Sequence, residues 1–312
     1  MTDLVKALSD LSEEEADDFF RETQAETVVE LVGCTSDRDL QKLIAVDHVR
    51  SAAVTNVLAR LEEFAVPERL AAVEGMVRFV LSRPRGDTET YSLRFSRGRV
   101  TLLPPDVEGT PDVVIDTDFI TFIRLVSGGE NAALLLLGGR LSVRGDEMLA
   151  LGVGGVFRVP GSEGVAVDPT ALDPVDVATA LNGVKDDHLR DVMSSDFRFV
   201  VLEEVFRRMP EFVDAEKVHR HNISVRFTIT GRPDGEVDEY VVHVRKGACF
   251  VDAGPGERHD ARITTSGADF LKLVTGHLNP ALGLMRGHLR VHGDVTAALT
   301  FSRLMHIPKA RH

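Results

Sequence analysis

The sequence is poor in cysteine and in positive charge, and both shortages limit what the protein can do. Its 312 residues include two cysteines, Cys34 and Cys249, with no CxxC motif. We therefore interpret both as core thiols of a protein from a reducing compartment. Lysine and arginine number 36 against 49 acidic residues, a formal net charge of -13. This charge repels nucleic-acid phosphates and anionic lipid headgroups, so we expect no nucleic-acid partner and only brief membrane contact.

Long apolar runs and targeting signals are also missing. No apolar run approaches the roughly 18 residues that a membrane-spanning helix needs, so the sequence predicts no stable membrane insertion. The longest dense apolar stretch extends only from Ala132 to Leu137. The first residues soon reach the acidic stretch Glu13–Glu15 and contain no basic region followed by an apolar one. They lack the pattern of a secretory signal, so we expect a cytoplasmic protein.

The motifs of nucleophilic catalysis are absent. The sequence has no Gly-x-Ser-x-Gly elbow and no cysteine close to a histidine in sequence, which are the usual signs of an activated nucleophile. A glycine-rich segment, residues 152–155, suggests a phosphate loop, but it lacks the final glycine of GxGxxG and follows no buried parallel strand. We interpret these glycines as loosening a helix, because each costs about 1 kcal/mol relative to alanine.

The chain repeats itself. Residues 111–160 match residues 259–308 without a gap at an offset of 148, as in Phe122/Phe270 and Gly145/Gly293. Upstream the match continues at an offset of 149, for example in Tyr91/Tyr240. Such self-similarity indicates two copies of one domain. We place the first copy at residues 1–165 and the second at residues 166–312.

The repeat also helps to assess the histidines. His288 and His292 are expected on one face of a strand, and His219 and His221 lie two residues apart. In the first copy, arginines stand where the second has His288 and His292, and no acidic or cysteine residue completes a ligand set at a recognisable spacing. We therefore expect no metal site, no cofactor and no catalytic residue. A reaction on a bound lipid, through His219 or His221, is the weakest alternative.

Each copy is predicted to begin with helices, indicated by the capping box of Ser12 with Glu15 and by Asp173 before Pro174. Alternating apolar residues and turn signals then predict five strands per copy. In the first copy these span residues 76–82, 89–96, 99–103, 113–115 and 140–144. In the second copy they span residues 223–230, 237–245, 248–252, 261–264 and 288–292. Helices are expected at residues 119–126, 132–137, 268–274 and 280–285, and one closing helix ends each copy. The order predicts an α+β fold with a mostly antiparallel sheet.

The last 50 residues of each copy carry a recognisable pattern. In the second copy Phe270 begins a helix, Gly276-His277-Leu278-Asn279-Pro280 forms a turn, and Gly287-His288-Leu289-Arg290-Val291-His292-Gly293-Asp294 forms a strand. This pattern resembles the signature of sterol carrier protein type 2 domains. The first copy repeats it with Ala132 in place of the proline, so we expect a looser turn there. The resemblance implies a five-stranded sheet backed by helices, with an apolar tunnel for sterols or fatty acyl chains.

Apolar side chains on the last strand and the helices around it are the candidates for lining this tunnel. Their spacing alone favours an ordinary core, whereas the resemblance favours ligand contact. In the first copy they are Phe122, Leu125, Val126, Leu134, Leu137, Leu141, Val143, Leu149, Val153, Val156 and Phe157. In the second copy they are Phe270, Leu273, Val274, Leu282, Met285, Leu289, Val291, Leu299, Phe301, Leu304 and Met305.

Two functions from different classes follow. The first is an intracellular, non-catalytic carrier of hydrophobic small molecules such as sterols or fatty acids, with the second copy as the more competent because it keeps the fuller pattern. The second is a structural or protein-interaction module, in which the copies form a pseudo-dimer that binds a partner enzyme or a second copy of the chain. Cavities filled by side chains in both copies would favour the second function.

Overall fold

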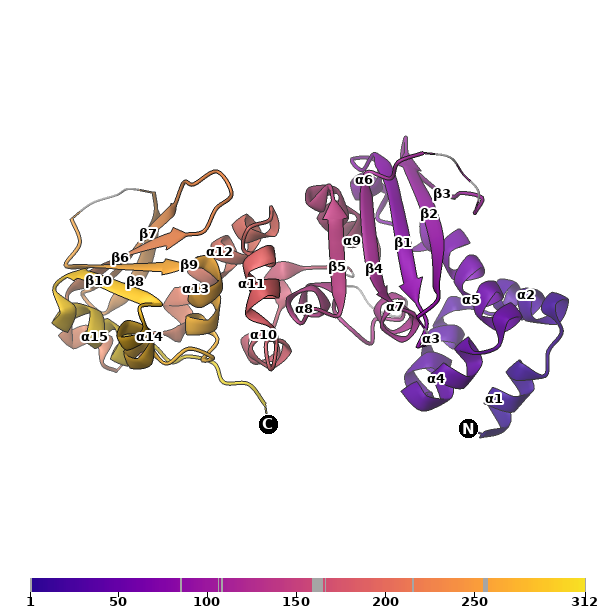
Figure 1. Cartoon of the computed structure of the whole chain (residues 1–312), viewed down its shortest axis with the longest axis horizontal. Helices are drawn as coiled ribbons and strands as arrows, with labels where there is room; N and C mark the ends of the chain where they lie inside the picture. The colour runs from indigo at the N-terminus through magenta and orange to yellow at the C-terminus, as the bar shows by residue number, and fades with distance from the viewer. Residues whose placement is uncertain are drawn as a thin grey trace. The chain divides into compact units, whose positions relative to one another are not determined.

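The protein consists of two compact units, residues Met1–Asp168 and Pro169–His312 (Figure 1). The computed structural model describes residues 2–84, 86–105, 107, 109–158, 165, 167–214, 216–254 and 258–311. The predicted division after residue 165 falls close to the boundary between the units.

The first unit begins with helices and continues with a sheet. Its helices before the sheet are α1 (Thr2–Ser9), α2 (Glu13–Glu22), α3 (Ala25–Cys34), α4 (Asp37–Ile44), α5 (Asp47–Ala59), η1 (Leu61–Phe64) and α6 (Pro67–Leu70). Four strands follow: β1 (Gly75–Ser82), β2 (Thr88–Ser96), β3 (Arg99–Leu102) and β4 (Val113–Asp118). The unit ends with α7 (Phe119–Val126), α8 (Ala132–Leu137), β5 (Leu141–Gly145) and α9 (Glu147–Val156).

The second unit repeats this order. It begins with η2 (Pro169–Ala171), α10 (Pro174–Ala180), α11 (Asp186–Val192), α12 (Phe197–Arg208), η3 (Met209–Phe212) and η4 (Val218–Arg220). Its strands are β6 (Ile223–Thr230), β7 (Asp238–Arg245), β8 (Ala248–Ala253) and β9 (Ala261–Ser266). The closing segment comprises α13 (Gly267–Val274), α14 (Pro280–Arg286), β10 (Leu289–Gly293) and α15 (Val295–Leu304).

Both sheets have the same topology. The strand order is β3-β2-β1-β4-β5 in the first unit and β8-β7-β6-β9-β10 in the second. The pairs β1–β4 and β6–β9 are parallel, and all other neighbouring strands in the two sheets are antiparallel. The predicted α+β fold with a mostly antiparallel sheet is confirmed, and the parallel pair at its centre makes the sheet a mixed one.

The helices cover one face of each sheet. In β1, Val77, Phe79 and Leu81 point to this face and are buried with residues of α5, α7 and α9 in one hydrophobic core. In β6 the equivalent face carries Phe227, whose ring contacts rings of α12, α13 and α15. Because side chains alternate along a strand, the residues between these positions lie on the opposite face, away from the helices.

The turn before α8 is as well capped as the turn before α14. The Asn131 side chain accepts hydrogen bonds from the backbone N–H groups of Ala133 and Leu134, at 2.9 and 3.3 Å. Asn279 accepts the same two bonds in the second unit, at 3.0 and 3.2 Å. The expectation of a looser turn in the first copy is wrong, because the asparagine cap, rather than the proline after it, holds the helix start.

The Gly-Asp pair that ends the last strand is structural. Gly145 has a φ of +101°, and a Cβ atom there would lie 2.3 Å from the carbonyl oxygen of Asp112. The next residue, Asp146, caps α9 through a bond from the Leu149 N–H. Gly293 and Asp294 have the same roles in the second unit. The pattern therefore marks a close strand approach followed by a helix start.

The glycines of α9 do not break the helix. α9 is continuous from Glu147 to Val156, the same length as α15. A Cβ atom on Gly154 would lie 2.4 Å from the Val167 side chain, and the Val167 N–H donates to the Gly154 carbonyl at 3.1 Å. Gly154 thus leaves room for the Val167 side chain beside a continuous helix, and the expectation that these glycines loosen α9 stays a prediction.

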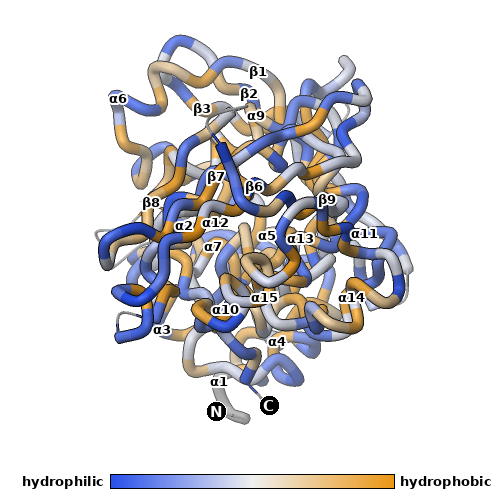
Figure 2. Tube along the Cα trace, turned by 90° about the vertical axis from the view of Figure 1, so that its left-hand side faces the viewer, coloured by the Kyte–Doolittle hydropathy of each residue, from blue (hydrophilic) through white to orange (hydrophobic). Residues whose placement is uncertain are grey.

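Helix α2 begins with three acidic residues. The acidic start of α2 is hydrophilic in Figure 2, and its capping box between Ser12 and Glu15 is present as predicted.

Cys34, at the end of α3, is exposed, so its interpretation as a core thiol is wrong. Cys249 on β8 is partly buried, and burial raises its pKa to about 11. Among the described residues no helix is long and apolar enough to cross a membrane.

Candidate functional site

Most of the predicted lining residues of the first copy converge. Nine of them belong to the hydrophobic core between the sheet and helices α5, α7 and α9, where four are buried and five are partly buried. These nine are Phe122, Leu125, Val126, Leu141, Val143, Leu149, Val153, Val156 and Phe157. Leu137 is also buried and Leu134 is partly buried, but neither belongs to that core.

The second copy brings together fewer of its candidates. Phe270, Leu289, Phe301 and Leu304 are buried, and four more candidates are partly buried, namely Leu273, Val274, Val291 and Met305. The remaining three are exposed: Leu282 to 46%, Met285 to 83% and Leu299 to 40%.

The three exposed side chains do not line the interior, which corrects the sequence expectation. α14 turns its buried Gly283 toward the Leu289 side chain, so Leu282 and Met285 lie on its solvent side. On α15 the buried side is formed by Phe301 and Leu304 together with two alanines, and Leu299 lies outside it.

The interiors of the two units differ in the size of their side chains. In the second, Phe206 stacks on Phe270 with ring centroids 5.1 Å apart, and Phe301 lies edge-on to Phe227 at 5.9 Å. At the positions of Phe206 and Phe301 the first unit has the smaller Leu58 and Val153. The opposite exchange occurs elsewhere, since the first unit has Phe119 and Phe157 in its core where the second has Gly267 and Met305. The two interiors therefore place their large side chains at different positions.

A buried arginine joins the helices to the sheet in each unit, and sequence reasoning missed it. The Arg198 side chain on α12 is 6% exposed, and its Nε atom lies 2.6 Å from Asp238 on β7. In the first unit Arg50 on α5 pairs with Glu89 on β2, also at 2.6 Å. The matching arginines at the repeat offset were the available signal.

The same acidic residue in the first unit contacts a tyrosine that borders the interior. The Tyr91 hydroxyl donates to Glu89 at 2.8 Å, and burial together with this carboxylate raises the tyrosine pKa. In the second unit Tyr240 stacks on Phe206, and burial raises its pKa as well. Both phenols therefore stay neutral at physiological pH.

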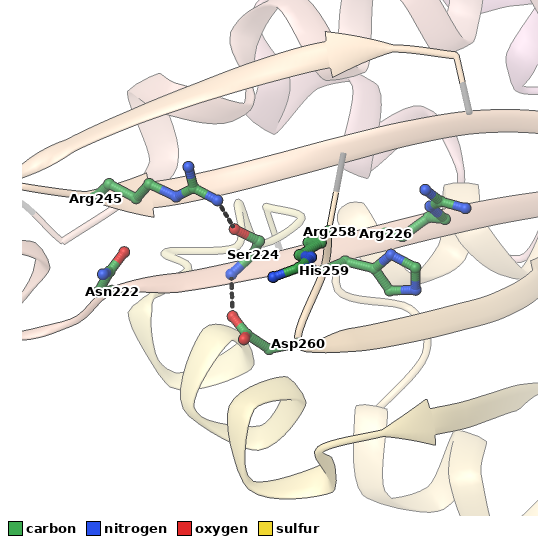
Figure 3. A pocket seen from close by; sticks show the side chains of 7 residues that line it. All are labelled: Asn222, Ser224, Arg226, Arg245, Arg258, His259 and Asp260. Carbon is green, nitrogen blue, oxygen red and sulfur yellow. Dashed lines mark hydrogen bonds between the residues drawn. The ribbon is translucent and has the colours of Figure 1, made fainter. Parts of the chain in front are cut away.

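The opposite face of the second sheet carries a polar cavity of about 610 Å³. Its walls are formed by Asn222, Ser224, Arg226, Arg245, Arg258, His259 and Asp260 (Figure 3). Ser224 and Arg226 alternate on β6 with the core residues Val225 and Phe227, so the cavity lies on the face away from the aromatic interior. Sequence reasoning missed it because its residues come from separate strands and a loop.

A row of hydrogen bonds forms beside this cavity. The Ser224 hydroxyl lies 2.8 Å from Nδ1 of His243, whose Nε2 lies 3.2 Å from Asp252. Arg245 donates to the same hydroxyl at 2.9 Å, and the Ser224 N–H donates to Asp260 at 2.8 Å (Figure 3). Ser224 and His243 are 3% and 1% exposed. The row holds a buried serine in place in the middle of a strand.

The histidines considered from the sequence belong to two separate segments, one at η4 and one at β10. His288 precedes β10 and contacts Asp269 at 3.0 Å. His219 packs against Gly247, where a Cβ atom would lie 2.1 Å from its ring. Within the described parts of the chain, no group of three or more histidine, cysteine or acidic side chains is arranged to hold a metal ion.

The chain thus contains two α+β units, each with an apolar interior between one sheet face and its helices. The sequence pattern of the SCP-2 sterol transfer family matches residues 55–158 and 202–306. These two ranges cover most of both units, so the chain belongs to this family of sterol and lipid binding or transfer domains.

Individual relatives match smaller parts of the chain. Sterol carrier protein 2 of Gallus gallus is 28% identical over 159 residues, which are 49% of this chain and 26% of that protein. Hydroxysteroid dehydrogenase-like protein 2 of Xenopus tropicalis is 26% identical over 105 residues, 33% of this chain and 24% of that protein. The chain thus spans about a quarter of the length of these relatives. The crystal structure of sterol carrier protein 2 like 2 from Aedes aegypti has 19% identity and a TM-score of 0.29, over 35% of this chain and 95% of that one.

Proposed function

We propose that the protein is an intracellular, non-catalytic lipid carrier that holds hydrocarbon between the sheet and helices of its units. The observation that carries this proposal is the convergence of nine predicted lining residues in the first unit, in a chain of a lipid-binding family. Sterols, fatty acids and fatty acyl chains are the substrate class. The free thiols of Cys34 and Cys249 support a reducing compartment such as the cytoplasm.

The first unit is the better candidate for a ligand that lies between α5 and the middle of α9. Its interior has Leu58 and Val153 where the second has Phe206 and Phe301. Smaller side chains leave more room when a guest separates the helices from the sheet. The sequence expectation favoured the second copy because of its fuller pattern, but the Asn131 cap removes the difference in the turn on which that expectation depended.

The affinity follows from the area of ligand that is buried. About 300 Å² of hydrocarbon at about 25 cal/mol per Å² gives a gross gain of about 7 kcal/mol before the cost of association. This value corresponds to dissociation constants of about micromolar or weaker. We therefore expect a carrier that accepts several apolar ligands of similar size.

Lipid extraction and ligand displacement test the proposal. The purified chain should release an apolar ligand into organic solvent and should bind a fluorescent fatty acid that other lipids displace. Val153→Phe, which copies the second unit, should weaken this binding, while Phe301→Val, which copies the first, should strengthen it. Circular dichroism checks that both variants fold. The proposal fails if the chain yields no lipid and binds no fatty acid.

The alternative is a structural or protein-interaction module, and the exposed apolar residues of α14 and α15 favour it. Leu282, Met285 and Leu299 leave apolar surface in water, as binding sites for proteins often do. A role in self-association predicts a homodimer in sedimentation experiments that Met285→Glu converts to a monomer. A chain that sediments as a monomer at all concentrations rules out the homodimer.

A further inference from the structure

The cavity on the outer face of the second sheet gathers positive charge in an acidic protein. Three arginines, Arg226, Arg245 and Arg258, and one histidine contribute to its walls, whereas Asp260 is its one acidic wall residue. The chain as a whole carries a net charge of -13. A cluster of cations in such a protein costs free energy through mutual repulsion unless an anion neutralises it.

Two of these arginines have no acidic partner of their own. Arg245 donates to the neutral hydroxyl of Ser224, and in the described part of the chain neither Arg245 nor Arg258 has a carboxylate within 4.0 Å. Arg226 lies 3.8 Å from Glu239. The carboxylate of Asp260 already accepts the Ser224 N–H at 2.8 Å, so its charge is partly committed to the backbone.

A further arginine continues the cluster on the neighbouring strand. Arg262 on β9 is the parallel-strand partner of Arg226, and alternation places it on the same face. The Arg262 Nε atom is buried and has no hydrogen-bond partner among the described residues. Its antiparallel partner on β10 is His292. The positive charge therefore extends from Arg226 on β6 to Arg262 on the neighbouring strand β9.

The first unit has the same fold with a different set of cations on this face, where Arg94 stands at the position of His243. At the positions of Ser224, Arg245, Arg258 and His259 it has Met76, Ser96, Thr110 and Pro111. Arg78, the counterpart of Arg226, remains and donates to the hydroxyl of Ser92 at 3.1 Å and to the Gly109 carbonyl at 3.3 Å. The fold itself thus does not require Arg245, Arg258 or His259, which are present in the second unit only.

We propose that this cavity binds a small molecule that bears phosphate groups. Guanidinium groups hold phosphate oxygens through paired, charge-assisted hydrogen bonds, and Arg245 and Arg258 are the groups available for them. A volume of about 610 Å³ exceeds what one inorganic phosphate fills and lies in the range of organic ligand sites. The ligand is therefore a diphosphate or an organic phosphate.

Beside the cavity, the buried Ser224 and His243 form a row of hydrogen bonds that ends at the exposed carboxylate of Asp252. His243 is 1% exposed and holds the Ser224 hydroxyl through a hydrogen bond. This hydroxyl accepts a hydrogen bond from Arg245 and so orients its guanidinium group. A guanidinium held in place loses less conformational entropy when it binds an anion. Ser224 and His243 are thus positioning residues, and the arginines are the ligand-binding ones.

Calorimetric titration of the full chain with inorganic pyrophosphate at low salt tests this site. We expect binding at one site per chain, weakened about tenfold or more by Arg245→Gln and by Arg258→Gln, because each removes a charge-assisted contact. The matched control is Arg78→Gln in the first unit, which should leave the affinity unchanged. Ser224→Ala should weaken binding less than either arginine variant.

A second arm distinguishes the source of the phosphate. Vesicles of phosphatidylcholine with and without phosphatidic acid are sedimented with the chain. Retention that requires phosphatidic acid and is lost in the Arg245→Gln variant identifies a lipid headgroup, whereas pyrophosphate binding without such retention identifies a soluble phosphate compound. The proposal is overturned if pyrophosphate does not bind, or if it binds equally well to both arginine variants while circular dichroism shows them folded.

Discussion

Replacing Arg198 by methionine should destabilise the second unit and leave the first unchanged. The guanidinium donates to the backbone carbonyls of Met193 and Ile229 at 2.8 and 2.9 Å and to the Asp238 carboxylate at 2.6 Å. Methionine fills the space of the aliphatic stem but offers no donor. The variant therefore removes one of the two arginine partners of a partly buried carboxylate, and the donor to the backbone carbonyls of Met193, Ile229 and Thr230.

The size of the effect follows from these contacts. Breaking a buried ion pair by removing one partner costs about 3–5 kcal/mol. Asp238 keeps a second arginine, Arg232, at 3.1 Å, so the cost should lie near the lower value, about 3 kcal/mol. With a urea dependence of about 2 kcal/mol per molar, this loss lowers the unfolding midpoint of the second unit by about 1.5 M.

The sequence provides a separate reporter for each unit, because it contains two tyrosines and no tryptophan. Tyr91 lies in the first unit and Tyr240 in the second. In a Tyr91→Phe background, fluorescence follows the second unit alone during urea titration. Arg50→Met, read through Tyr91 in a Tyr240→Phe background, is the matched experiment in the first unit. A loss below about 1 kcal/mol for Arg198→Met would refute the reasoning.

Three further predictions use the same chain. Gly293→Ala should cost about 2 kcal/mol more than Gly235→Ala in urea unfolding, since both glycines have positive φ but only the first would bring a Cβ atom to 2.6 Å from a backbone oxygen; equal costs would contradict this. Asn131→Ala and Asn279→Ala should each cost about 1 kcal/mol, and a much smaller loss at Asn279 would show that the proline holds that turn. In a Cys34→Ser background, thiol labelling of Cys249 should accelerate about tenfold per pH unit up to its pKa of about 11, and a flat profile would exclude the raised pKa.

Local patterns in the sequence were enough to place the secondary structure. The helices Phe119–Val126 and Ala132–Leu137 have the predicted bounds, because apolar spacing and the caps around them are local features. The fifth strand begins one residue later than predicted in both units, at Leu141 and Leu289. Self-similarity between the copies indicated the number of domains without any structural information.

Burial of the candidate site depended on contacts that apolar spacing does not encode. Met285 matched the pattern of a lining residue, but α14 turns Gly283 to the sheet and leaves Met285 in solvent. Gly154 was interpreted from the sequence only as a residue that loosens a helix, and the structure adds its close contact with the Val167 side chain. In both cases the partner is a residue of another element, and its distance from the site depends on packing.

The sequence by itself determined the class of this protein: two copies of an α+β domain, acidic overall, with apolar faces that match a lipid-binding family. Periodicity and repetition suffice for that, since both are properties of the chain order. Only the tertiary structure decided which side chains meet. Arg226 on β6, Arg245 on β7 and Arg258 before β9 border one cavity because strand register and the loop before β9 bring them together. No local spacing predicts that meeting, because it depends on which strands pair and on which face each side chain lies.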